Sequence, residues 1–88
     1  MSKLYAKAIK QFGEEAQLRQ ATEECAELIQ AITKVQRYGS RVRRIDNLIE
    51  ELADVQIMME QVMQMYNLES LVSEVKREKL QRLRKRLK

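Results

Sequence analysis

The sequence predicts an all-α fold, a bundle of about four helices that is completed by homo-oligomerisation. The chain has 88 residues with no proline and only two glycines, which stand at positions where helices would end. Apolar residues recur in alternating steps of three and four along two long stretches, a rhythm typical of helices that pack along a shared stripe. So short a chain, with few aromatic residues, supplies little core by itself. We therefore expect a homodimer or a dimer of dimers.

A short helix is expected over residues 3–12 and a long one from about residue 14 to residue 37. Gly13 is the predicted C-cap of the first helix. Glu14 and Glu15 suit the positive N-terminal end of the second, and the clearest break in the sequence follows it at residues 38–40. The side chains expected to face inward from the first helix are Leu4, Tyr5, Ala8, Ile9 and Phe12.

Two further helices are expected, from about residue 44 to residue 66 and from about residue 69 to the end. The stretch 41–44 fits either a loop or an early helical turn. Asn67 could either stop the third helix or cap the fourth. No linker divides the chain, so we predict a single domain over residues 1–88, with its basic end, residues 84–88, frayed.

Two acidic motifs repeat each other on the two long helices. Glu24 and Glu27 lie three residues apart, as do Glu51 and Asp54, so each pair projects from one side of its helix. Both pairs are expected to border a buried apolar stripe at the same angle. The predicted stripes are Leu18, Ala21, Cys25, Leu28, Ile32 and Val35 in one helix, and Ile45, Leu48, Leu52, Val55, Met59, Val62 and Tyr66 in the other.

Four carboxylates that converge between two helices repel one another and need compensating positive charge. Ligand sets made only of oxygen suit Mg²⁺, Mn²⁺ or Ca²⁺ better than zinc. A single acidic pair would more simply be a solvated helix face, because glutamate is a strong helix former. Two equivalent pairs, each preceded by a further glutamate (Glu23 and Glu50), favour a metal site.

The two motifs resemble the signature of the MazG-like superfamily of all-α nucleoside triphosphate pyrophosphohydrolases. The matching pattern is Glu23-Glu24-x-x-Glu27 followed by Glu51-x-x-Asp54, with Phe12-Gly13 and Gln17-Leu18 before it. The resemblance spans roughly residues 5–82. It implies Mg²⁺-dependent cleavage of nucleoside triphosphates to a monophosphate and pyrophosphate, with Mn²⁺ as a possible substitute.

The resemblance also implies roles for individual acids. Glu24, Glu27, Glu51 and Asp54 match the metal ligands, and Glu23 is the best candidate for the catalytic base or water-orienting group. Glu50 is less certain, because the family motif does not require it. Candidate contacts to substrate phosphates are Lys34, Lys79 and Arg82.

The positive charge of the chain is concentrated at its end. Residues 76–88 hold eight basic side chains and one acidic one, whereas the preceding residues hold nine basic and twelve acidic side chains. A basic helix of this kind could bind nucleic acid, or the chain could be a non-catalytic interaction module. We consider nucleic acid an unlikely partner because the rest of the chain is acidic, and the complete set of acids argues against a lost activity.

Other classes of function find less support. The chain contains no histidine that could activate Cys25 as a nucleophile, so a buried thiol is the simpler interpretation. No signal peptide and no apolar run long enough to span a bilayer is apparent, so we expect no membrane partner and a cytoplasmic location.

Overall fold

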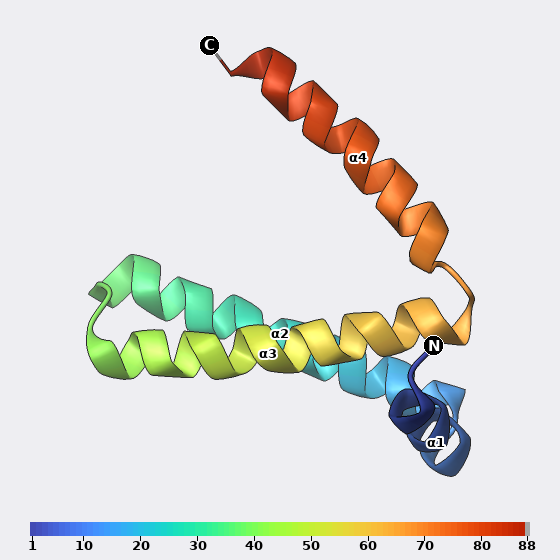
Figure 1. The fold of residues 1–88 in the computed structure, drawn as a ribbon. Helices are drawn as coiled ribbons and strands as arrows, with labels where there is room; N and C mark the ends of the chain where they lie inside the picture. Colours follow the sequence, from blue (N-terminus) through green and yellow to red (C-terminus); the bar gives the residue numbers. More distant parts are fainter. Residues whose placement is uncertain (88) are drawn as a thin grey trace.

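The computed structural model describes residues 1–87, and every regular element in that range is a helix, which confirms the predicted all-α class. Helices α2 and α3 run antiparallel and side by side as a two-helix layer, and α1 packs against both of them near one end (Figure 1). Helix α4 leaves the same end on the other side of the layer (Figure 1). The helices are α1 (Lys3–Phe12), α2 (Glu14–Tyr38), α3 (Val42–Met65) and α4 (Glu69–Arg86).

The two glycines end α1 and α2 as predicted. Gly13 has φ 91° and Gly39 has φ 94°, and residues with a Cβ rarely adopt such backbone conformations. The N–H of each glycine donates to a carbonyl of the preceding helix, at Ile9 and Val35. These bonds satisfy carbonyls that would otherwise lack partners at the helix ends.

The remaining helix ends settle two points that the sequence left open. Helix α3 begins at Val42, and the Arg44 guanidinium ties the preceding turn by donating to the carbonyls of Tyr38 and Gly39 at 2.7 Å each. Asn67 has φ 54° and therefore stops α3 rather than beginning α4. Helix α4 stays helical through Arg86, while Lys88, the last residue of the predicted frayed end, lies outside the described residues.

The seam between α2 and α3 keeps some positions of the predicted apolar stripes and is shifted by one residue at others. Ala21, Leu28 and Val55 face it as expected, but Leu18, Ile32, Leu52 and Tyr66 are exposed by 36 to 44%. The prediction of those four as buried was therefore wrong for the single chain. The seam is lined instead by side chains that directly precede positions of the predicted stripes, such as Gln17, Glu24, Ala31, Glu51 and Met58.

This shift gives the layer two different faces. In antiparallel helices the residues that directly follow seam positions all point to one side of the layer, and those that directly precede them point to the other. The first set forms an apolar face, which includes Leu18, Ile29, Ile32, Ile49 and Leu52. The second set forms an acidic face, which includes Gln20, Glu23, Glu27, Glu50 and Asp54.

Three hydrogen bonds tie the first turn of helix α1 to α3. The backbone of Ser2 donates to Gln64 Oε1 at 3.0 Å and accepts from Gln64 Nε2 at 2.9 Å, and the Tyr5 hydroxyl donates to Glu60. Leu4 and Phe12, which were expected to face inward, are 72% and 60% exposed. The expectation was wrong for these two residues, whereas Tyr5, Ala8 and Ile9, expected on the same face, are half-buried.

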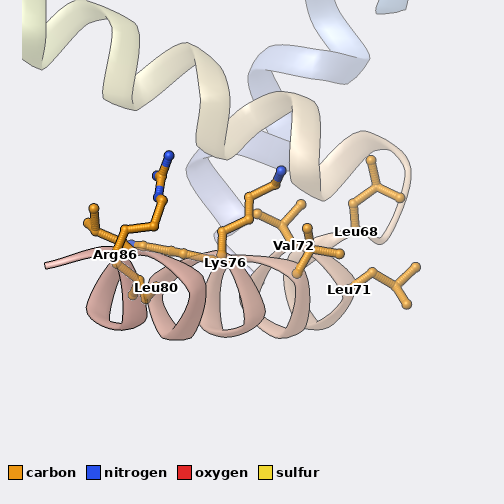
Figure 2. Close-up of a pocket in the computed structure, with 9 residues that line it drawn as sticks. Leu68, Leu71, Val72, Lys76, Leu80 and Arg86 are labelled. Atoms are coloured by element: carbon orange, nitrogen blue, oxygen red, sulfur yellow. The ribbon is translucent and has the colours of Figure 1, made fainter.

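Helix α4 has an apolar stripe that nothing within residues 1–87 covers. Among the other helices it contacts only α3, near the turn that joins them. Figure 2 shows Val72, Lys76 and Arg86 rising from α4 toward the ribbon of the layer. Residues of α4 together with Leu68 line a groove of about 590 Å³ there. Within residues 1–87, no helix is long and apolar enough to cross a membrane.

Candidate metal centre

Three of the four predicted ligands meet between α2 and α3. Glu24, Glu51 and Asp54 each offer a carboxylate oxygen, and these oxygens all lie within 4.8 Å of one another. Glu24 and Glu51 occupy facing seam positions, and Asp54 follows Glu51 by about one turn on the acidic face. The convergence predicted from the repeated motifs is thus present within one chain for these three acids.

Two of these carboxylates have atoms that lack partners. Oε2 of Glu24 and Oε2 of Glu51 are both buried and accept no hydrogen bond within the described residues. A buried carboxylate oxygen without a donor is costly, because it has lost water and gained nothing in exchange. A divalent cation would satisfy both atoms, and oxygen donors of this kind are those that Mg²⁺ and Mn²⁺ prefer.

The crowding of acids raises two carboxyl pKa values. The pKa of Glu51 lies above its ordinary value, chiefly through desolvation, then through hydrogen bonding with and repulsion from Glu27, and also through repulsion from Asp54 and Glu24. The pKa of Glu24 is raised chiefly by desolvation, with further contributions from Glu27 and Asp54, against a lowering hydrogen bond from Gln20. Both shifts disfavour the ionised carboxylates in the absence of a cation.

The raised pKa values predict how the cation-free protein responds to pH. A carboxyl whose pKa is higher in the folded chain favours folding below its unfolded pKa, and this contribution is lost as pH rises through the folded pKa. With EDTA present, Glu51→Gln should therefore raise the urea midpoint above that of the wild type at pH 7.5. The difference should shrink at mildly acidic pH, where the wild-type Glu51 takes up a proton. A wild type at least as stable as the variant at pH 7.5 would contradict this.

The other predicted site residues lie at different distances from this centre. Glu27 stands outside the group of three oxygens but close enough to Glu51 to raise its pKa. Glu23 and Lys34 are exposed on α2, on the same side of the layer as Asp54. Lys79 and Arg82 lie on α4, where with Lys85 and Arg86 they line a separate groove of about 580 Å³. Within one chain α4 makes no contact with α2.

Sequence reasoning missed a neutral residue of the centre, Gln20. Its Nε2 donates to Glu24 Oε1 at 2.8 Å. It also lines a cavity of about 170 Å³ together with Glu24, Asp54, Ile57 and Met58. Its position four residues before Glu24 is the spacing of side chains that meet on a helix, so the signal was present in the sequence.

Comparison with known proteins places this arrangement in a family. No curated protein and no solved structure matches the chain. A family of nucleotide-cleaving domains does match, over residues 12–87, a span that includes both acidic motifs and all three clustered acids. The chain belongs to the MazG nucleotide pyrophosphohydrolase domain family.

Proposed function

We propose that the protein is a nucleoside triphosphate pyrophosphohydrolase that depends on a divalent cation, Mg²⁺ or alternatively Mn²⁺. It cleaves ribo- or deoxyribonucleoside triphosphates between the α- and β-phosphates and releases a monophosphate and pyrophosphate. The observation that supports this most directly is the meeting of Glu24, Glu51 and Asp54, with two buried carboxylate oxygens that have no partner. Membership of the MazG family supports the choice of reaction.

The acidic residues have separate roles in the proposed reaction. Glu24, Glu27, Glu51 and Asp54 hold the cation, which when bound neutralises phosphate charge and acidifies the attacking water. Glu23 lies on the acidic face beside Glu24, exposed and free to orient that water and accept its proton. Because Glu24 and Glu51 belong to opposite helices, the packing of α2 on α3 sets the spacing of the ligands.

A panel of ribo- and deoxyribonucleoside triphosphates incubated with Mg²⁺ tests the reaction. Pyrophosphate and orthophosphate are measured separately, and the matched sample contains excess EDTA. We expect pyrophosphate and monophosphate in equal amounts with at least one nucleotide, and no release after chelation. Release of orthophosphate alone, or activity that survives full chelation, would refute the proposal.

The same chain is proposed to assemble as a homodimer or a dimer of dimers. Its solvent-accessible surface area is 7472 Å², whereas that of a compact monomer of its mass is about 5,400 Å². Its radius of gyration is 15.9 Å, against about 12 Å for a compact chain of this length. The excess of about 2,000 Å² is enough for an obligate interface.

The apolar face and the stripe of α4 supply the surface for that assembly. Ile29, Ile49 and Leu52 are 64%, 58% and 44% exposed on the layer, and Val72 and Val75 are 42% and 48% exposed on α4. A second copy that packs its own layer against these side chains completes a four-helix bundle. The acidic face lies on the other side of the layer, so assembly leaves the centre open to nucleotides.

The basic residues of α4 are proposed to act on the substrate only within this assembly. Lys79 and Arg82 stand about one turn apart and can hold one anion together. Helix α4 diverges from the layer in a single chain, so a partner subunit is needed to bring these cations to a nucleotide (Figure 1). Lys34 remains a proposed phosphate contact from within the same layer.

A further inference from the structure

We infer that Gln20 is a positioning residue of the metal centre, which orients Glu24 so that one of its oxygens is free for the cation. This inference rests on the proposed function, since it concerns the same site. Two contacts point to it: the hydrogen bond from Gln20 Nε2 to Glu24 Oε1 at 2.8 Å and the shared cavity beside Asp54.

Because of this hydrogen bond, the two carboxylate oxygens of Glu24 have different surroundings. Oε1 accepts from Gln20, while Oε2 is buried and accepts from nothing within the described residues. A carboxylate held by one oxygen cannot rotate freely about its last bond, so Oε2 keeps its place beside Glu51 and Asp54. Glu24 is therefore the ligand that this contact fixes in advance.

The chemistry of the amide suits this role. A lysine at the same place would also donate, but its positive charge would compete with the cation for the carboxylates. A glutamine donates without adding charge, and it keeps a second N–H and a carbonyl oxygen for water. The cavity of about 170 Å³ that it lines leaves room for such water next to the carboxylates.

A bond between residues four apart on a helix also has a purely structural interpretation. Such pairs stabilise helices slightly, and Gln20 and Glu24 both belong to α2. The two interpretations differ in what they leave unchanged. A structural role affects unfolding and leaves cation affinity alone, whereas a positioning role affects cation affinity even when the fold is intact.

Binding of Mn²⁺ by the full chain, followed by electron paramagnetic resonance without nucleotide, tests the inference. Gln20→Leu keeps most of the side-chain volume and removes the donor. Gln20→Ala also removes the donor, and alanine favours the helix. Gln30→Leu is the matched control, an exposed glutamine of the same helix. We expect the Kd for Mn²⁺ to rise about tenfold in both Gln20 variants, the usual effect of losing an outer partner of a ligand, and to stay unchanged in the control.

Turnover provides a second measurement that separates positioning from substrate contact. Activity of Gln20→Leu should recover at saturating Mg²⁺, with an unchanged KM for the nucleotide. Mn²⁺ affinity within twofold of the wild type in both Gln20 variants would overturn the inference, and so would a raised KM that excess Mg²⁺ does not restore. A wild type that binds no Mn²⁺ would instead overturn the proposed function itself, together with this inference.

Discussion

Replacing Glu51 by glutamine should lower pyrophosphate release by more than about 100-fold, which corresponds to about 3 kcal/mol of lost transition-state stabilisation. Glu51 lies in the seam among three other acids, and its buried Oε2 has no partner within the described residues. The amide has nearly the same shape but no charge, so the cation loses a ligand while the helices keep their packing. Rates of pyrophosphate release at saturating Mg²⁺, with circular dichroism on the same samples, make the measurement.

Glu50→Gln is the matched control for this change. Glu50 precedes Glu51 on α3, is exposed, and takes no part in the cluster of three carboxylates. We expect the control to keep its activity within about twofold, since isolated surface charges contribute little. Near-normal activity of Glu51→Gln would remove Glu51 from the ligand set. Equal losses in both variants would mean that net charge, rather than the cluster, governs activity.

Introducing a charge into the proposed interface should separate the subunits. Leu52→Asp alters the apolar face and Val72→Asp alters the stripe of α4, two surfaces that α1, α2 and α3 leave exposed. Each change enters a symmetric dimer twice. At about 2 kcal/mol for each buried contact, the dissociation constant should rise about 1,000-fold. Sedimentation velocity at micromolar concentration, with helicity measured in parallel, detects the change.

Ser73→Asp is the control for Val72→Asp. Ser73 follows Val72 on α4 but does not line the apolar groove. The control should sediment like the wild type, whereas the two interface variants should appear as monomers with reduced helicity, because a monomer lacks sufficient core. A wild type that sediments as a fully folded monomer at micromolar concentration would contradict the proposed assembly.

The sequence was sufficient to predict the helices and the meeting of acids, because both depend on local signals. Gly13 and Gly39 marked helix ends through backbone conformations that glycine adopts readily. Glu24 and Glu51 hold equivalent places in the two repeated motifs, so the sequence placed each of them beside the stripe along which its helix packs. Gln20 was overlooked because an amide gives no signal by charge, although its spacing from Glu24 was visible.

The choice between two neighbouring stripes could not be predicted from the sequence. On α2 the more apolar stripe contains Leu18 and Ile32, and hydrophobicity alone selects it as the core. The seam instead uses Gln17 and Ala31, which are 7% and 1% exposed. Periodicity identifies which residues seek burial, but it does not say whether the covering surface belongs to the same chain. Small side chains such as Ala31, and the paired amides of Gln17 and Gln61, where Gln17 Nε2 donates to Gln61 Oε1 at 2.7 Å, allow the close contact within the chain. The larger apolar residues are left outside it.

The short turn between α2 and α3 has a consequence for the order of folding. The turn spans residues 39–41 and is tied by Arg44, so the two helices can pair by closing a small loop, an event of microseconds or less. In the proposed assembly, burial of the apolar face requires an encounter with a second chain, which is slower and depends on concentration. Helix α4 also leaves the ribosome after α1, α2 and α3. In the proposed assembly, a newly made chain would therefore bring Glu24 and Glu51 together before it meets its partner, and the partner would then stabilise that pairing.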